Sequence, residues 1–470
     1  VRGIHKDGVD AFLGIPYAKP PVGELRFLPP MACEPWEGVR EADAFGPSPM
    51  QPQQAGNERL VMDTPNACSE DCLYLNIWAP ENAKGKKLPV MYWIYGGAYT
   101  VGTTASGIYD GSAFAKNQDV IVVSVNYRVG IFGFMAHPFL DKRAEHSTNA
   151  GLADMIAGLK WVRDHIECFG GDPDNVTLFG ESAGSSAINV LMVCPEANGL
   201  YHAAITQSGS PFNHDEWDRD KQATQQRCID YMKSVGIESE AEFYAAPAEQ
   251  FVADIMGYFG AEFSPYVDGD LLPERLEEAF LKGHIYDVPV ILGCTADEAT
   301  ILIGDRNKVT KEKFEQTLQR KYPNHKAYIY EKYGEYVEAD PAYALARFRS
   351  DNTIANMRYY ASCLSQNRKQ PVYYYIFQHT MPGEDSDFYG AFHGGEIPYH
   401  FENLHKGALP YAKADQVISK TMAKYWATFA KTHNPNGEGL VEWKAFTPEN
   451  DLILYIDETC ECLPLKTREL

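Results

Sequence analysis

The chain has 470 residues, of which 45% are hydrophobic and 23% charged, a composition typical of a folded globular protein with a large core. Its formal net charge of −22 argues against a nucleic-acid partner, because a phosphate backbone would be repelled. The same charge favours neutral or cationic substrates over anionic ones. No stretch approaches the ~18 apolar residues of a membrane-spanning helix.

Short apolar runs recur along the chain and predict the strands of a sheet. Most are continuously apolar, as expected where helices cover both faces. Helical patterns lie between them, such as 151–169 with its apolar side chains on one face. This alternation predicts an α/β fold with a large, mostly parallel sheet between two layers of helices. The predicted strands are 88–97, 119–128, 175–180, 203–209, 288–293, 372–377 and 452–456.

Two segments, 212–262 and 305–365, are helical, charged and poor in strand patterns. We expect them to be insertions above the edge of the sheet, where lids and substrate pockets usually lie. No linker sets them apart, so residues 1–470 are predicted to form a single domain, although length alone would suggest about three.

Ten cysteines are dispersed along the chain without a CxxC pair or a Cys/His cluster, so the sequence implies neither a zinc site nor another metal. Scattered thiols favour a reducing compartment, and residues 1–10 lack the apolar core of a signal peptide. We therefore expect a cytoplasmic protein, with secretion left open if a leader was removed.

A glycine-rich turn lies at the end of the first predicted strand. Gly96, Gly97 and Ala98 come directly after an apolar run, where bare backbone N–H groups are free to converge on a developing oxyanion. Taken alone, this pattern is also that of an ordinary glycine turn.

A second turn, 180–184, reads G-E-S-A-G and joins a predicted strand to a predicted helix. In that context G-x-S-x-G indicates a sharp turn that presents Ser182 above the sheet, with glycines where bulk would collide. The helix N-terminus favours negative charge there, and Ala183 adds another N–H to the oxyanion donors. The motif predicts a nucleophilic serine.

A serine nucleophile needs a histidine base, and the base needs an acid to orient it. His393 stands out among the later histidines because glycines flank it, shortly after the predicted strand at 372–377. Asp297 and Glu298 follow the strand at 288–293, at the edge where such sheets hold functional groups. Spacing alone does not choose between these two carboxylates.

Taken together, these motifs resemble the type-B carboxylesterase and cholinesterase-like family of α/β-hydrolases. The resemblance spans nearly the whole chain and is most specific at "CFGGDPDNVTLFGESAGSSA", residues 168–187. The segments that carry it are 12–27, 69–80, 93–99, 122–134, 168–187, 293–300 and 393–399.

The resemblance implies roles that spacing could not assign. The acid of the family matches Glu298, its base His393, and its nucleophile Ser182. Its oxyanion donors fall on the N–H groups of Gly97, Ala98 and Ala183. Positions that support the histidine or its surroundings in the family match Glu181, Ser208 and Glu396. Its structural ion pairs match Arg26 with Glu70 and Arg128 with Asp154.

The chain departs from the secreted and choline-specific members of the family. Cys72 lacks the partner that secreted members provide, which leaves Cys33 and Cys68 as substitutes and favours a cytoplasmic, bacterial-type enzyme. The tryptophan that holds a quaternary ammonium group in cholinesterases would align near Met62. Without an aromatic face there, choline-ester specificity is not expected.

We therefore expect a serine carboxylesterase that hydrolyses small ester substrates through Ser182, His393 and Glu298 and requires no cofactor. Alternatives are amide, carbamate or thioester hydrolysis by the same groups, or a lipase, although the segment 242–260 is acidic for a lipase lid. A non-catalytic adhesion homologue is not expected, because all three site residues are present.

Overall fold

The computed structural model describes residues 1–52, 66–144, 148–212, 219–252 and 263–466. In these ranges an eleven-stranded sheet has the order β1-β2-β5-β7-β6-β8-β9-β10-β11-β12-β13. Strands from β7 to β12 in this order run parallel, while β1, β2 and β5 at one edge and β13 at the other are antiparallel to their neighbours. The predicted α/β fold with a mostly parallel sheet is therefore confirmed.

The strands of this sheet have the following bounds: β1 Ile4–Lys6, β2 Val9–Pro16, β5 Tyr74–Pro80, β6 Leu88–Ile94, β7 Ile121–Val125, β8 Gly171–Glu181, β9 Ala203–Gln207, β10 Val290–Thr295, β11 Val372–Phe377, β12 Leu452–Ile456 and β13 Glu461–Pro464. A separate pair joins β3 (Ser48–Pro49) to β4 (Cys68–Ser69). Every residue of β6, β7, β10 and β11 is buried, which explains their continuous apolar patterns.

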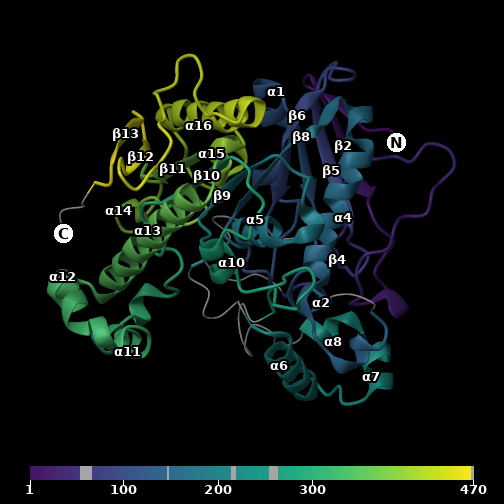
Figure 1. Ribbon diagram of the computed structural model, residues 1–470, viewed down its shortest axis with the longest axis horizontal. Helices are drawn as coiled ribbons and strands as arrows, with labels where there is room; N and C mark the ends of the chain where they lie inside the picture. The colour runs from purple at the N-terminus through teal and green to yellow at the C-terminus, as the bar shows by residue number, and fades with distance from the viewer. Residues whose placement is uncertain (53–65, 145–147, 213–218, 253–262, 467–470) are drawn as a thin grey trace.

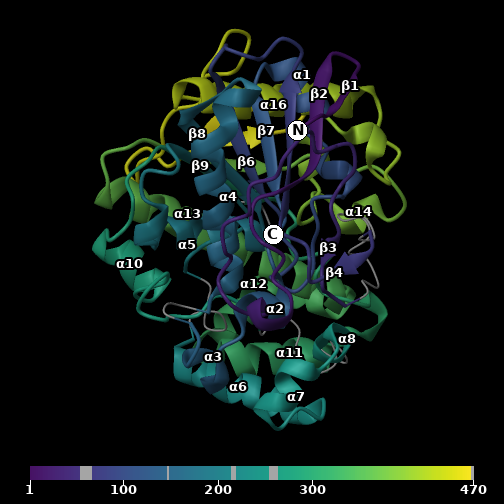
Figure 2. The ribbon, with the colours of Figure 1, turned by 90° about the vertical axis from the view of Figure 1, so that its right-hand side faces the viewer.

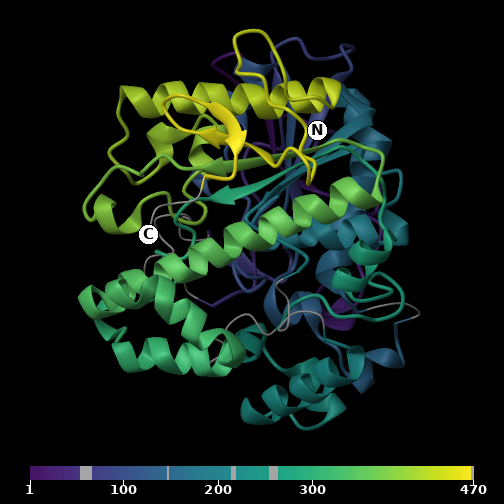
Figure 3. The ribbon, with the colours of Figure 1, turned by 60° about the vertical axis from the view of Figure 1, so that its left-hand side comes forward.

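Different helices cover the two faces of the sheet, as adjacent residues of β6 show. Tyr92 donates its hydroxyl to the carbonyl of Met155 at 2.9 Å, on α4 (Ala150–His165). Trp93 points to the opposite face and packs on Phe401, with ring centroids 5.0 Å apart. The first face carries α4, α5 (Ala183–Val193), α10 (Leu276–Lys282) and α13 (Pro341–Asn367), and the second carries α1 (Ser112–Gln118), α15 (Ile397–His400) and α16 (Lys413–Thr432). Figure 3 shows strands between α13, in green, and α16, in yellow-green.

The remaining α-helices gather largely at one end of the molecule. These are α2 (Gly130–Phe134), α3 (Pro138–Asp141), α6 (Lys221–Ser234), α7 (Glu240–Ala245), α8 (Ala248–Val252), α11 (Lys311–Lys321), α12 (Lys326–Ala339) and α14 (Ser386–Tyr389). In Figures 1 and 2, α6, α7, α8, α11 and α12 lie at the end that carries α2. Because α2 follows β7, this is the end to which the carboxyl termini of the parallel strands point.

The two segments expected to be insertions form helices in this region. Of 212–262, residues 213–218 and 253–262 lie outside the described ranges, and the rest forms α6, α7 and α8. In 305–365, α11, α12 and the start of α13 enclose a small apolar cluster around Phe314 and Leu318. The later part of α13 packs on β10 and β11, so this segment also covers the sheet.

Within the described ranges, none of the helices combines the length and the apolar character that crossing a bilayer requires. All ten cysteines lie in these ranges and carry free thiols. Cys72 therefore forms a disulfide with neither Cys33 nor Cys68.

Candidate active site

The turn at 180–184 joins β8 to α5 and holds Ser182 in a strained conformation with a positive φ of +57°. The Ser182 N–H donates to the carbonyl of Gln207, the last residue of β9, at 2.8 Å. A Cβ at Gly184 would lie 2.0 Å from the Ile94 carbonyl oxygen, and one at Gly180 would lie 2.7 Å from it. Both glycines are thus required because the turn lies against the end of β6.

Ser182 occupies the N-cap position of α5, and every residue of that helix is buried. The positive end of the helix therefore lies at Ser182 within the fold, where partial charges are screened less than at an exposed terminus.

His393 and Glu298 form a close pair, with 2.5 Å between Nδ1 and Oε2. The other carboxylate oxygen of Glu298 accepts from the Ser208 hydroxyl at 2.6 Å. It also accepts from the Thr295 N–H at 2.7 Å and hydroxyl at 2.9 Å. Burial alone would raise the pKa of Glu298, but His393 and these donors lower it below its ordinary value. Glu298 is therefore held as a buried carboxylate aimed at the imidazole.

Asp297 has different partners from its neighbour Glu298. Its N–H donates to the Ala391 carbonyl at 2.9 Å, and its Oδ2 accepts from the Ala391 N–H at 3.0 Å. Arg347 lies 3.8 Å from the Asp297 carboxylate. Asp297 thus holds the backbone two residues before His393, whereas Glu298 contacts the imidazole itself.

Two more carboxylates lie close to His393. Oε1 of Glu181 is 3.2 Å from Nε2, and Glu396 is completely buried, with Oε1 accepting from the Gln207 amide at 3.1 Å. Burial lowers the pKa of His393, but the three surrounding carboxylates outweigh it and raise the value to about 10. Burial raises the pKa of Glu181 and of Glu396, and Glu298 adds to both shifts.

The hydroxyl of Ser182 and the imidazole of His393, both within the described residues, do not form a hydrogen bond. The Nε2 edge of the imidazole instead faces Glu181, which directly precedes the serine. Bonds of this kind often tighten only when substrate binds. The structure therefore brings His393 between Glu298 and the turn that carries Ser182, without a hydrogen bond between the serine and the imidazole.

The glycine turn after β6 lies directly beside Ser182. A Cβ at Gly96 would come within 3.0 Å of the Ser182 Cβ. Gly97 and Ala98 have φ of +105° and +53°, which turns this backbone sharply. Across the described ranges, the N–H groups of Gly97, Ala98 and Ala183 have no hydrogen-bond acceptor. They are available to bind an anion next to the serine.

The two ion pairs implied by the resemblance are present. Arg26 contacts Glu70 through two bonds of 2.5 and 2.6 Å. Arg128 contacts the buried Asp154 through two bonds of 2.8 and 2.7 Å. Met62 lies outside the described residues, so the structure does not address the expected loss of an ammonium site there.

Sequence reasoning missed two residues that support the site, Thr295 and Gln207. Thr295 donates twice to Glu298, and Gln207 bridges Glu396 and Trp426, with the indole N–H donating to the amide oxygen at 3.2 Å. Both end a strand, β10 and β9. The sequence could have pointed to both residues, because each is a polar residue at the end of an apolar run, at the edge of the sheet where functional groups usually lie.

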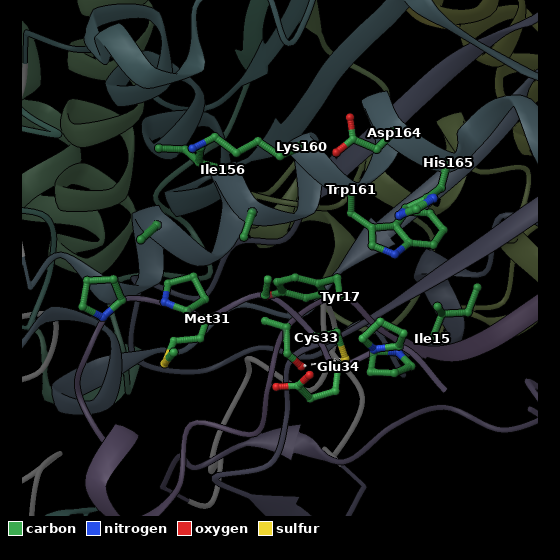
Figure 4. A pocket seen from close by; sticks show the side chains of 18 of the residues that line it. Ile15, Tyr17, Met31, Cys33, Glu34, Ile156, Lys160, Trp161, Asp164 and His165 are labelled. Carbon is green, nitrogen blue, oxygen red and sulfur yellow. Dashed lines mark hydrogen bonds between the residues drawn. The ribbon is translucent and has the colours of Figure 1, made fainter. Parts of the chain in front are cut away.

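A cavity of about 750 Å³ lies elsewhere, between α4 and the segment 15–36. Figure 4 shows its walls, which include Tyr17, Met31, Trp161 and His165. Neither Ser182 nor either partner of its candidate triad lines this cavity. Among the described residues, no group of three or more His, Cys, Asp or Glu side chains is arranged to hold a metal.

Comparisons with known proteins agree on one family. A model described as "Carboxylesterase family" matches residues 1–469. The para-nitrobenzyl esterase of Bacillus subtilis (strain 168) is 35% identical, covering 97% of this chain and 93% of its own, and a cocaine esterase of Oryctolagus cuniculus is 34% identical, covering 95% and 88%. The crystal structure of a Geobacillus stearothermophilus carboxylesterase at pH 6.2 has a TM-score of 0.85 and 34% identity, covering 98% of this chain and 95% of that one.

Proposed function

This chain belongs to the carboxylesterase family and is a carboxylic ester hydrolase, and from that premise we propose that Ser182, His393 and Glu298 hydrolyse the ester through an acyl-enzyme. The observation that carries the proposal is the buried Glu298–His393 pair, 2.5 Å long. The other edge of its imidazole, at Nε2, faces Glu181 in the turn that carries Ser182.

In the first step, Nε2 of His393 accepts the proton of the Ser182 hydroxyl as Oγ attacks the ester carbonyl carbon. The C=O π electrons move to the carbonyl oxygen. Gly97, Ala98 and Ala183 donate their N–H groups to that oxyanion. Glu298 holds the imidazole in place, and the surrounding carboxylates stabilise the positive charge that His393 acquires.

In the second step, the tetrahedral intermediate expels the alcohol, which takes the proton from His393. Water then attacks the acyl-enzyme, with His393 again accepting a proton, and the acid leaves as Ser182 is restored. Every step uses groups of this chain, the ester and water.

The substrate class we propose is a small ester that is neutral or cationic. The net charge of −22 supports this preference, because the field of the protein opposes the approach of an anion. The names of the para-nitrobenzyl and cocaine esterases among the relatives recommend aromatic esters as the first probes.

The test uses nitrophenyl esters of increasing acyl length, on the wild type, Ser182→Ala and Ser186→Ala. Loss of the nucleophile should lower kcat by at least ~10³-fold on every ester. Ser186 is buried on the same helix, one turn on, and its alanine variant should keep most of the activity. Hydrolysis by Ser182→Ala at the wild-type rate would refute the assignment.

A further inference from the structure

The segment Gly96–Gly102, which carries two of the proposed oxyanion donors, forms a tight loop whose ends meet. The carbonyl of Gly97 accepts from the N–H groups of Thr100 at 2.9 Å and Val101 at 3.1 Å. A Cβ at Gly102 would lie 2.8 Å from the Gly96 carbonyl oxygen and 2.3 Å from the Tyr95 ring. The loop is therefore closed at its base.

This loop has a backbone conformation that does not form readily by itself. Gly97, Ala98 and Tyr99 have consecutive positive φ values of +105°, +53° and +57°. A residue with a side chain is strained in this region, so surrounding contacts must hold it there. One contact holds the middle, where the Gly130 N–H donates to the Tyr99 carbonyl at 2.5 Å.

A second contact holds the end of the loop and comes from Gln51, far away in the sequence. The Gln51 amide donates to the Gly102 carbonyl at 2.8 Å and accepts from the Gly102 N–H at 2.9 Å. It also donates to the Pro49 carbonyl at 3.0 Å. Only 7% of Gln51 is exposed, so both Gly102 groups would lose their partners on removal of the amide.

The residues after Gly102 are also held by hydrogen bonds to other segments. Thr103 accepts from the Ser48 hydroxyl at 2.7 Å, and Thr104 donates its N–H to the Asn126 side chain at 3.0 Å. Gln51 differs from these anchors because it holds a residue of the loop itself. By binding Gly102, Gln51 fixes the end of the loop that carries the Gly97 and Ala98 N–H groups.

We propose that Gln51 is a positioning residue for the oxyanion donors: its amide clamps Gly102 and thereby holds the N–H groups of Gly97 and Ala98 next to Ser182. The inference rests on the proposed function, because it assumes that these groups stabilise the oxyanion. Gln51 would thus act through the backbone of the loop, because its amide contacts Gly102 and Pro49.

The test compares two substitutions of Gln51. Gln51→Glu keeps an acceptor for the Gly102 N–H but loses the donor to the Gly102 and Pro49 carbonyls, whereas Gln51→Met loses all three bonds at similar size. We expect kcat to fall ~10- to 100-fold in both, because the new carboxyl oxygen of the first faces two carbonyl oxygens, the second makes none of the bonds, and small displacements of the oxyanion donors are costly. KM should change far less, since the ground-state ester makes little use of the donors.

A second readout isolates the oxyanion. An alkyl trifluoromethyl ketone forms a hemiketal anion on the serine. Its inhibition constant should therefore rise in the Gln51 variants by the same factor as kcat/KM falls. Hydrogen exchange at the Gly102 amide should accelerate. Gln118→Met is the control, because that amide binds Glu402 at 3.2 Å and makes no contact with the loop; it should leave kcat and inhibition unchanged.

The outcomes separate this inference from the proposed function. If Ser182→Ala stays active, the proposed function fails first. Suppose instead that Ser182→Ala is inactive. If folded Gln51→Met then hydrolyses the ester and is inhibited by the ketone as the wild type is, only the role of Gln51 is refuted. If Gln51→Met does not fold, Gln51→Glu decides: wild-type kcat with wild-type inhibition refutes the proposal, and a parallel loss supports it.

Discussion

At the scale of single residues, two adjacent carboxylates hold different parts of the site. Glu298 contacts the imidazole of His393 at 2.5 Å, while Asp297 pairs with the backbone of Ala391 at 2.9 and 3.0 Å. Sequence spacing offered both as the acid. The separation arises because one side chain is turned into the fold beside Ser208 and the other along the loop that carries the histidine.

Removing the charge of Glu298 should therefore lower turnover much more than removing the charge of Asp297. We expect Glu298→Gln to lower kcat by ~10³–10⁴-fold, because the imidazole loses the group that orients and stabilises it. Asp297→Asn keeps an acceptor for the Ala391 N–H and should cost less than ~10-fold. Steady-state kinetics on one nitrophenyl ester measure both, and a larger loss in Asp297→Asn would show that the acid is misassigned.

The pH dependence of turnover should report the carboxylates around His393. A base must be neutral to accept a proton, and the raised pKa of His393, about 10, delays its neutral form to alkaline pH. Activity should thus rise with pH. Glu181→Gln removes the carboxylate that raises this pKa most, so the rising limb should move to lower pH, with a lower plateau because the imidazolium is less stabilised. An unmoved limb would contradict this account.

At the scale of elements, the junction of β8 and α5 depends on its contact with the end of β6. The carbonyl oxygen of Ile94 lies 2.0 Å from where a Cβ at Gly184 would be and 2.7 Å from one at Gly180. A turn this close to a neighbouring strand tolerates no side chain at those positions. The same close approach makes the turn sharp, with Ser182 at its centre.

Gly184→Ala should therefore destabilise the protein. Its Cβ would lie 2.0 Å from a backbone oxygen, and crowding of this kind costs about 1–3 kcal/mol. Gly334→Ala is the matched control: it lies in α12, meets only the Tyr330 ring at 3.8 Å, and should stabilise by about 0.5–1 kcal/mol through helix propensity. Thermal unfolding measures both, and equal shifts would exclude a specific clash at the turn.

Element prediction succeeded for the parallel strands of the sheet, which are almost entirely buried. The runs at 372–377 and 452–456 match β11 and β12. The run at 88–97 ends as a strand at Ile94, because its last residues turn into the loop beside Ser182. Strands β1, β2, β5 and β13 of the sheet were not predicted. Much of β2 is only partly buried, so its apolar pattern is weaker, whereas β5 is buried from Leu75 to Pro80 and was missed despite that burial.

At the scale of the whole molecule, the excess of acidic residues sets a field that any substrate must cross. The formal net charge is −22, and such fields act on association rates over about one screening length. That length is about 10 Å at 0.1 M salt and about 3 Å at 1 M.

Salt should therefore change the discrimination between charged esters. For three nitrophenyl esters of similar size that are neutral, cationic and anionic, kcat/KM at low salt should be lowest for the anionic one. Raising the salt should increase kcat/KM for the anionic ester, decrease it for the cationic one, and leave the neutral one nearly unchanged as the internal control. A preference that does not respond to salt would mean that contacts inside the pocket decide it.

The sequence by itself determined the fold class, the family, and the types and order of the groups in the candidate site. Those follow from local patterns: apolar runs, a strand–turn–helix motif and glycine-flanked polar residues. The family resemblance already implied Glu298 as the acid, but only the tertiary structure decided what Asp297 contacts instead, how close Glu181 comes to His393, and that Gln51 binds a loop about fifty positions away. These contacts join segments distant in the chain, and only the packing of the sheet brings them together.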